Sequence, residues 1–91
     1  MVMLPTTDPK QRFGRRLRTL RLSKGLSQET LAARAGLDRT YVSGCERGQR
    51  NIGLENIYRL SGALGVSPAE LFIDPVDEIM NRGSGNAPQK E

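Results

Sequence analysis

The feature that most constrains this chain is the stretch QETLAARAGLDRTYVSGCER at positions 28–47. It has apolar residues at helical spacing on both sides of Gly36, and glycine readily adopts the positive φ that a sharp bend after a helix requires. Ala32 is small where two helices would approach closely, and Val42 would point from the second helix back onto the first. The stretch therefore predicts a helix-turn-helix, a motif whose second helix can lie in a DNA major groove.

Helix signals on both sides of this stretch predict an all-α fold. Asp8-Pro9 has the cap and the first-turn proline of a helix start, and Gly25 would end that first helix. A fourth helix is predicted from the apolar spacing between Leu54 and Leu64. The run SPAE at positions 67–70 has the pattern of a capping box and predicts a fifth helix.

These elements make one domain over residues 8–73, which we expect to be a compact five-helix bundle. A second aspartate–proline pair predicts a short extra helix over residues 74–82. Residues 1–7 and 83–91 lack any helical periodicity and have the composition of a flexible arm and a flexible tail.

Charge is distributed unevenly along the chain. Positions 10–50 hold eleven basic and three acidic residues, whereas positions 51–91 hold three basic and six acidic ones. A basic first half of this kind suggests a face for a polyanion. No acid lies between Lys10 and Glu29, so the arginines of the first helix cannot pair within that helix. They form either a solvated basic face or phosphate contacts, and we favour phosphate contact for some of them, Arg16 among them.

Several classes of function are disfavoured by what the sequence lacks. There is no histidine and only one cysteine, Cys45, which leaves no zinc site and no intramolecular disulfide. The inward helical position of Cys45 suggests a small buried hydrophobe in a reducing cytoplasm rather than a redox switch. No apolar run approaches the ~20 residues of a membrane span, no nucleophile has a visible base partner, and no glycine loop could hold a phosphate. We therefore expect a cytoplasmic protein without a cofactor, a membrane segment or enzymatic activity.

The second helix of the motif begins with side chains that could read DNA. Asp38 is placed to cap this helix, and Arg39, Thr40 and Ser43 would project outward. Arginine can donate two hydrogen bonds to O6 and N7 of guanine, which contributes about 1–3 kcal/mol of discrimination between bases. Tyr41 is placed either for a phosphate contact through its hydroxyl or for packing.

Gln28 stands at the N-terminus of the first helix of the motif. Unpaired N–H groups and the helix dipole favour phosphate at such a position. The side chain could bind a phosphate, brace a recognition side chain, or stand exposed without a partner. Arg50 and Asn51 lie in the loop that follows the second helix.

Three blocks of sequence follow one another with regular spacing: LSQETLAARAGL, TYVSGCERG and LENIYRLSGALGVSPAELF. With these blocks the chain resembles the XRE-type helix-turn-helix regulators, the relatives of phage repressors and Cro, from about Phe13 to Phe72. The run LDRTYVSGCERGQRN is particularly similar to the controller proteins of restriction–modification systems. The resemblance implies a phage-repressor-like fold and a small dimeric regulator that binds operators upstream of its own gene and an endonuclease gene.

The resemblance also implies roles for individual residues. Arg39 would read bases, and its neighbours on the same face would contact DNA beside it. Gln28 would touch the backbone, and Arg50 with Asn51 would meet DNA from the loop. The predicted DNA-binding residues are Arg16, Gln28, Arg39, Thr40, Tyr41, Ser43, Arg47, Arg50 and Asn51.

As a mechanism, two subunits would present their recognition helices to successive major grooves ~34 Å apart and so read a roughly palindromic site. RNA polymerase is a candidate partner of the DNA-bound protein. The main alternative is an XRE-type antitoxin that also binds a protein partner, for which residues 75–91 form a short extension. Apolar side chains near the C-terminus would form the interface of the homodimer: Leu71, Phe72, Val76, Ile79 and Met80.

Overall fold

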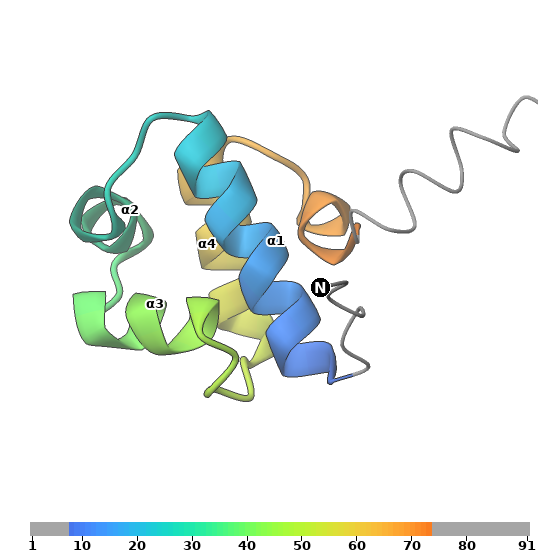
Figure 1. The fold of residues 1–91 in the computed structure, drawn as a ribbon. Coiled ribbons are helices and arrows are strands. Elements are labelled where there is room, and N and C mark those ends of the chain that lie inside the picture. Colours follow the sequence, from blue (N-terminus) through green and yellow to red (C-terminus); the bar gives the residue numbers. More distant parts are fainter. Residues whose placement is uncertain (1–7, 74–91) are drawn as a thin grey trace, which may run out of the picture.

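The computed structural model describes residues 8–73, which form four α-helices and a short 3-10 helix and contain no strand. The predicted all-α class is therefore confirmed. The predicted arm at 1–7, the extra helix at 74–82 and the tail at 83–91 lie outside the described residues. The elements, coloured along the chain in Figure 1, are α1 (Pro9–Ser23), α2 (Gln28–Ala35), α3 (Arg39–Glu46), α4 (Leu54–Leu64) and η1 (Pro68–Phe72).

The first three helices begin at the caps that the sequence predicts. The side chains of Asp8, Ser27 and Asp38 accept hydrogen bonds from backbone N–H groups in the first turns of α1, α2 and α3, at 2.9, 3.0 and 2.9 Å. Between α2 and α3, Gly36 has the left-handed conformation with φ 70°, and its N–H closes the end of α2. These local signals set the geometry of the helix-turn-helix.

A helical segment is present where the fifth helix is predicted, but residues 68–72 form a short 3-10 helix and not an α-helix, so a bundle of five α-helices is not confirmed. Ser67 occupies the N-cap position, but its side chain makes no capping hydrogen bond. Glu70, which would have closed the capping box, accepts hydrogen bonds from Arg16 at both its side chain and its backbone carbonyl. The turn is therefore held by α1 and not by its own capping signals.

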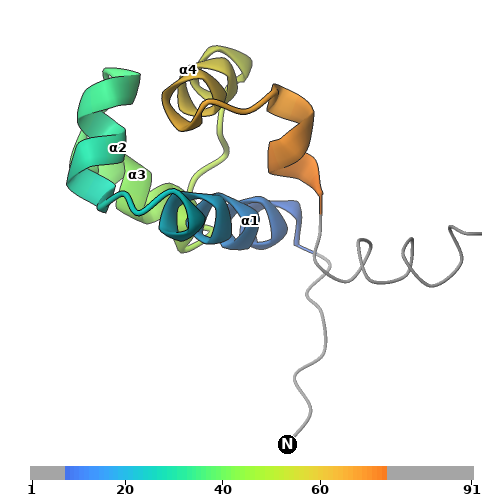
Figure 2. The ribbon, with the colours of Figure 1, turned by 90° about the horizontal axis from the view of Figure 1, so that it is seen from above.

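The core lies where all five elements meet. Every element contributes to its largest fully buried side chains, which are Leu17 of α1, Leu31 of α2, Val42 and Cys45 of α3, Leu60 of α4 and Leu71 of η1. Figure 2 shows α1 and α4 on opposite sides of this core, with α2 towards one end and η1 towards the other. The burial of Cys45 raises the pKa of its thiol above the ordinary value, as the loss of solvation of a thiolate requires.

Gly14 lets α1 approach the end of α3 closely. A Cβ atom at this position would lie 2.3 Å from the carbonyl oxygen of Cys45 and 2.7 Å from that of Glu46. Only glycine fits this crossing without moving backbone. Helix α1 packs on α3 and on η1 and lies between them. As a result, α3 and η1 are on different sides of the molecule (Figure 1).

Candidate nucleic-acid interface

The N-terminal end of α3 is fixed by its cap and presents an exposed arginine. Asp38 accepts hydrogen bonds from the N–H of Thr40 at 2.9 Å and from its hydroxyl at 2.7 Å. These two bonds, aided by the charge of Arg39, hold the pKa of the Asp38 carboxyl below its usual value. The Thr40 hydroxyl proton is therefore committed to the cap, while the exposed Arg39 projects from the first turn of a rigidly started helix.

Tyr41 links α3 to α4 and to the loop between these two helices. Its hydroxyl oxygen accepts a hydrogen bond from Nδ2 of Asn56 at 3.0 Å. The guanidinium of Arg50 stacks over its ring, 5.4 Å from the centroid, and such an exposed contact stabilises by about 0.5–1 kcal/mol. The Arg50 side chain also covers Gly44, where a Cβ atom would lie 3.1 Å from Nε. Tyr41 is half-buried, and its ring holds the side chain of Arg50 beside α3.

A buried ion pair joins α1 to the end of α3. Arg21 donates from Nε to Oε2 of Glu46 at 2.5 Å and from Nη2 to Oε1 at 3.0 Å, and the two side chains are 7% and 2% exposed. The bond with Glu46 raises the pKa of Arg21, although burial opposes this. Its remaining Nη1 donates to the carbonyl of Leu26 at 2.8 Å. The sequence gives no local signal for this pair, because Glu46 lies 25 positions after Arg21.

Gln28 is bound to the same carboxylate. Its Nε2 donates to Oε1 of Glu46 at 3.0 Å, which joins the first residue of α2 to the last residue of α3. Of the three interpretations open from the sequence, bracing describes this contact, but the braced residue is Glu46 and not a side chain on the reading face. The half-buried Gln28 therefore joins the N-terminus of α2 to the C-terminal end of α3.

The prediction that Arg16 contacts phosphate is contradicted by its position. Arg16 is only 8% exposed and donates from Nε to the carbonyl oxygen of Glu70 at 2.8 Å and from Nη2 to its Oε1 at 3.3 Å. It therefore joins α1 to η1. A signal was available, since Arg16 follows Phe13 by three positions and precedes Leu20 by four, which places it on the apolar side of the helix.

The last residues of the predicted set lie at and after the C-terminal end of α3. The exposed Arg47 binds the hydroxyl oxygen of Ser43 through Nη1 and the side-chain oxygen of Gln49 through Nε and Nη2, at 3.3 and 3.1 Å. Asn51 is exposed in the loop next to Arg50. Apart from Arg16, the predicted residues thus lie on α3, at the start of α2 and in the loop after α3.

Residues 8–73 contain no group of three or more Cys, Asp or Glu side chains arranged to hold a metal ion. None of the helices described is long and apolar enough to cross a membrane.

Comparison with known proteins identifies the family. A helix-turn-helix family model, HTH_3, matches residues 17–71, which span the motif and the helices around it. The chain belongs to the XRE-type helix-turn-helix family. The predicted resemblance is confirmed, and it extends to the restriction–modification controller proteins described next.

Controller proteins are close relatives of this XRE-type chain. Control protein C.MunI of a Mycoplasma species is 50% identical over 68 residues, which are 74% of this chain and 92% of that protein. The crystal structure of the controller protein C.AhdI from Aeromonas hydrophila is 62% identical with a TM-score of 0.69, covering 69% of this chain and 96% of that one. The controller C.Esp1396I, solved as a tetramer with its natural 35 base-pair operator, is 34% identical with a TM-score of 0.67, covering 74% of this chain and 88% of that one.

Proposed function

We propose that this protein is a sequence-specific, double-stranded-DNA-binding transcriptional regulator of the restriction–modification controller type. In this proposal it acts as a homodimer on a roughly palindromic operator. The observation that carries it is the exposed Arg39 at the capped start of α3, in a chain whose relatives are controller proteins. Because these relatives are controller proteins, we favour a regulator over an antitoxin that neutralises a toxin.

In this function Arg39 reads a base and its neighbours hold the helix against the backbone. Its guanidinium fits the O6 and N7 atoms of guanine, for about 1–3 kcal/mol of discrimination per subunit. The N-terminus of α2, kept in place by Gln28, offers N–H groups and a positive helix end to a phosphate. Arg50 and Asn51 approach from the loop, and Arg50 is already oriented by the ring of Tyr41.

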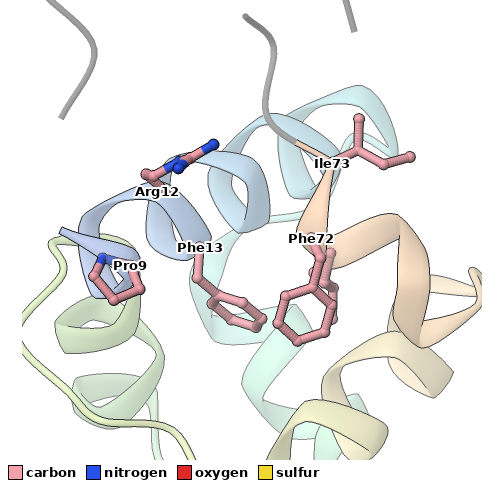
Figure 3. A pocket seen from close by; sticks show the side chains of 6 residues that line it. Pro9, Arg12, Phe13, Phe72 and Ile73 are labelled. Atoms are coloured by element: carbon pink, nitrogen blue, oxygen red, sulfur yellow. The ribbon is translucent and has the colours of Figure 1, made fainter. Parts of the chain in front are cut away.

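The homodimer contact is proposed at the side of the molecule that carries η1. Phe72 is 62% exposed, and its ring meets that of Phe13 edge-on with centroids 5.5 Å apart. The two rings line a groove of about 270 Å³. Figure 3 shows them facing each other, with Pro9, Arg12 and Ile73 around them. A second copy placed there would leave α3 free for DNA, because α1 separates the two surfaces. RNA polymerase is proposed only as a partner of the DNA-bound dimer.

One of the predicted interface assignments changes with the structure. Leu71 is fully buried in the core, so it is not available to a second subunit. Phe72 is exposed and remains the apolar residue proposed for the contact. The other predicted contacts, Val76, Ile79 and Met80, lie outside the described residues.

The proposal is tested by selecting bound sites from a random duplex pool and then comparing Arg39→Ala with the native protein. The substitution should reduce the preference for the selected duplex over random duplex by about ten- to a hundredfold per subunit. Arg34→Ala, at the opposite end of α2 from Gln28, removes the same charge as a control and should keep the preference. Equal losses on both duplexes would exclude base reading by Arg39, and a native protein that enriches no site would refute the proposed function.

A further inference from the structure

A second basic surface lies at the junction of α1 and α3. A hollow of about 240 Å³ is lined there by Gln11, Arg15 and Arg18 of α1 and by Glu46 and Arg47 at the end of α3. The three α1 residues are spaced by four and three positions, which places them on one side of the helix. Neither Arg15 nor Arg18 was singled out from the sequence as a binding residue.

Close packing keeps these side chains beside the end of α3. Gly14 brings α1 against the carbonyl groups of Cys45 and Glu46, as described above. One turn earlier, Gln11 packs against Gly48, where a Cβ atom would lie 2.6 Å from Cγ of the glutamine. The row of α1 side chains and the residues that end α3 therefore form one continuous surface.

The charge of this hollow is strongly positive. Its one acidic residue, Glu46, is 2% exposed in its side chain, and its charge is neutralised by Arg21. Arg15 and Arg18 are exposed, and within residues 8–73 neither makes an ion pair. With Arg47 they leave three guanidinium groups around a space that is open to an anion.

The hollow borders the surface that was proposed to read DNA. Arg47 binds Ser43 on the recognition helix, and Glu46 binds Gln28 at the start of α2. A duplex seated on α3 would therefore continue past this junction. Guanidinium groups bind phosphate with paired, charge-assisted hydrogen bonds, and an amide such as that of Gln11 can add a further donor.

We propose that Arg15 and Arg18, together with Arg47, bind the sugar–phosphate backbone next to the half-site that α3 reads. This inference rests on the proposed function and extends the contact surface onto α1. The contacts would position the protein and strengthen binding without sequence preference, because phosphates carry no base information. The phosphate contact that the sequence assigned to Arg16 is therefore proposed for Arg15 and Arg18, because Arg16 is buried in the fold.

The test is the salt dependence of binding for Arg15→Ala and Arg18→Ala, measured on the duplex selected as above and on a random duplex. Each substitution removes one phosphate contact per subunit and two per bound dimer. The slope of log affinity against log salt should therefore fall by about 1.8, and the affinity by about thirtyfold at 0.15 M salt, on both duplexes. Arg34→Ala removes an equal charge from the far end of α2 and should leave the slope unchanged.

The possible results separate this inference from the proposed function. Because both side chains are exposed, the variants should unfold at the native midpoint, so loss of binding cannot be ascribed to loss of fold. If the native protein binds its selected duplex and both variants keep its slope, or if Arg34→Ala loses as much, the inference is overturned while the function stands. If the native protein binds no duplex, both are overturned.

Discussion

The buried pair between Arg21 and Glu46 should dominate the stability of the helix-turn-helix. Glu46→Gln removes the charge of the carboxylate without opening a cavity. It leaves a guanidinium that is 7% exposed without a counter-ion, and it turns a carboxamide NH₂ group towards the donors of Arg21 or Gln28. Breaking a buried pair in this way costs about 3–5 kcal/mol. That is a large part of the roughly 5–15 kcal/mol that holds a small domain together.

Urea and thermal unfolding would measure this loss. For a domain of this size the substitution should lower the Tm by at least about 12 °C. The control is Glu70→Gln, the same change in the half-exposed pair with Arg16, where the side chain of Glu70 is 44% exposed. Solvent reaches the carboxylate of Glu70, and the bond from Nε of Arg16 to the backbone carbonyl of Glu70 is kept, so the loss should be smaller than for Glu46→Gln, at about 1 kcal/mol.

A double variant distinguishes the effect of the two charges on stability from the effect of side-chain volume. Arg21→Met with Glu46→Leu removes both ions and fills the volume with apolar atoms. Its free energy of unfolding should lie within about 2 kcal/mol of the native value, the remainder reflecting the lost donors to Leu26 and the lost acceptor for Gln28. A loss below about 1 kcal/mol for Glu46→Gln, or losses that simply add in the double variant, would refute the assignment of a strongly coupled buried pair.

Two further predictions concern the α1–α3 crossing and the dimer. Gly14→Ala should lower the free energy of unfolding by about 1–3 kcal/mol, because the new methyl group meets backbone carbonyls. Gly62→Ala in α4, where a Cβ atom meets nothing within 4 Å, should raise it by about 0.5–1 kcal/mol, so changes of the same sign in chemical denaturation would contradict the crossing geometry. Sedimentation should show a native dimer at micromolar concentration and a folded monomer for Phe72→Glu. A native protein that stays monomeric with and without DNA would disprove the proposed interface.

Much of the motif could be predicted because its signals are local. A capping side chain acts on N–H groups two or three residues away, as Asp8, Ser27 and Asp38 show, and Gly36 acts through its own backbone. Local rules failed at residues 68–72, where a complete capping-box pattern produced a 3-10 helix. The reason lies outside the segment, since Glu70 is bound by a residue 54 positions away.

The candidate site, too, could be predicted from the sequence only in part. The outward residues of α3 follow from helical spacing, so Arg39, Thr40 and Ser43 could be placed on one face from the sequence alone. Spacing alone did not show that Gln28 is held by Glu46, 18 residues later, or that Arg50 stacks on Tyr41. These contacts form between separate elements, and the pattern within one helix carries no information about them.

The amino-acid sequence by itself determined the helix starts, the glycine turn, the family and the excess of positive charge before residue 51. The tertiary structure alone decided which of the first-helix arginines are buried in the fold and which stay exposed on its surface. Arg16 and Arg21 are buried because Glu70 and Glu46 reach them from 54 and 25 positions away, while Arg15 and Arg18 stay exposed. Burying a guanidinium costs several kcal/mol unless a carboxylate and hydrogen-bond acceptors arrive with it, and only the packing of distant helices brings them together.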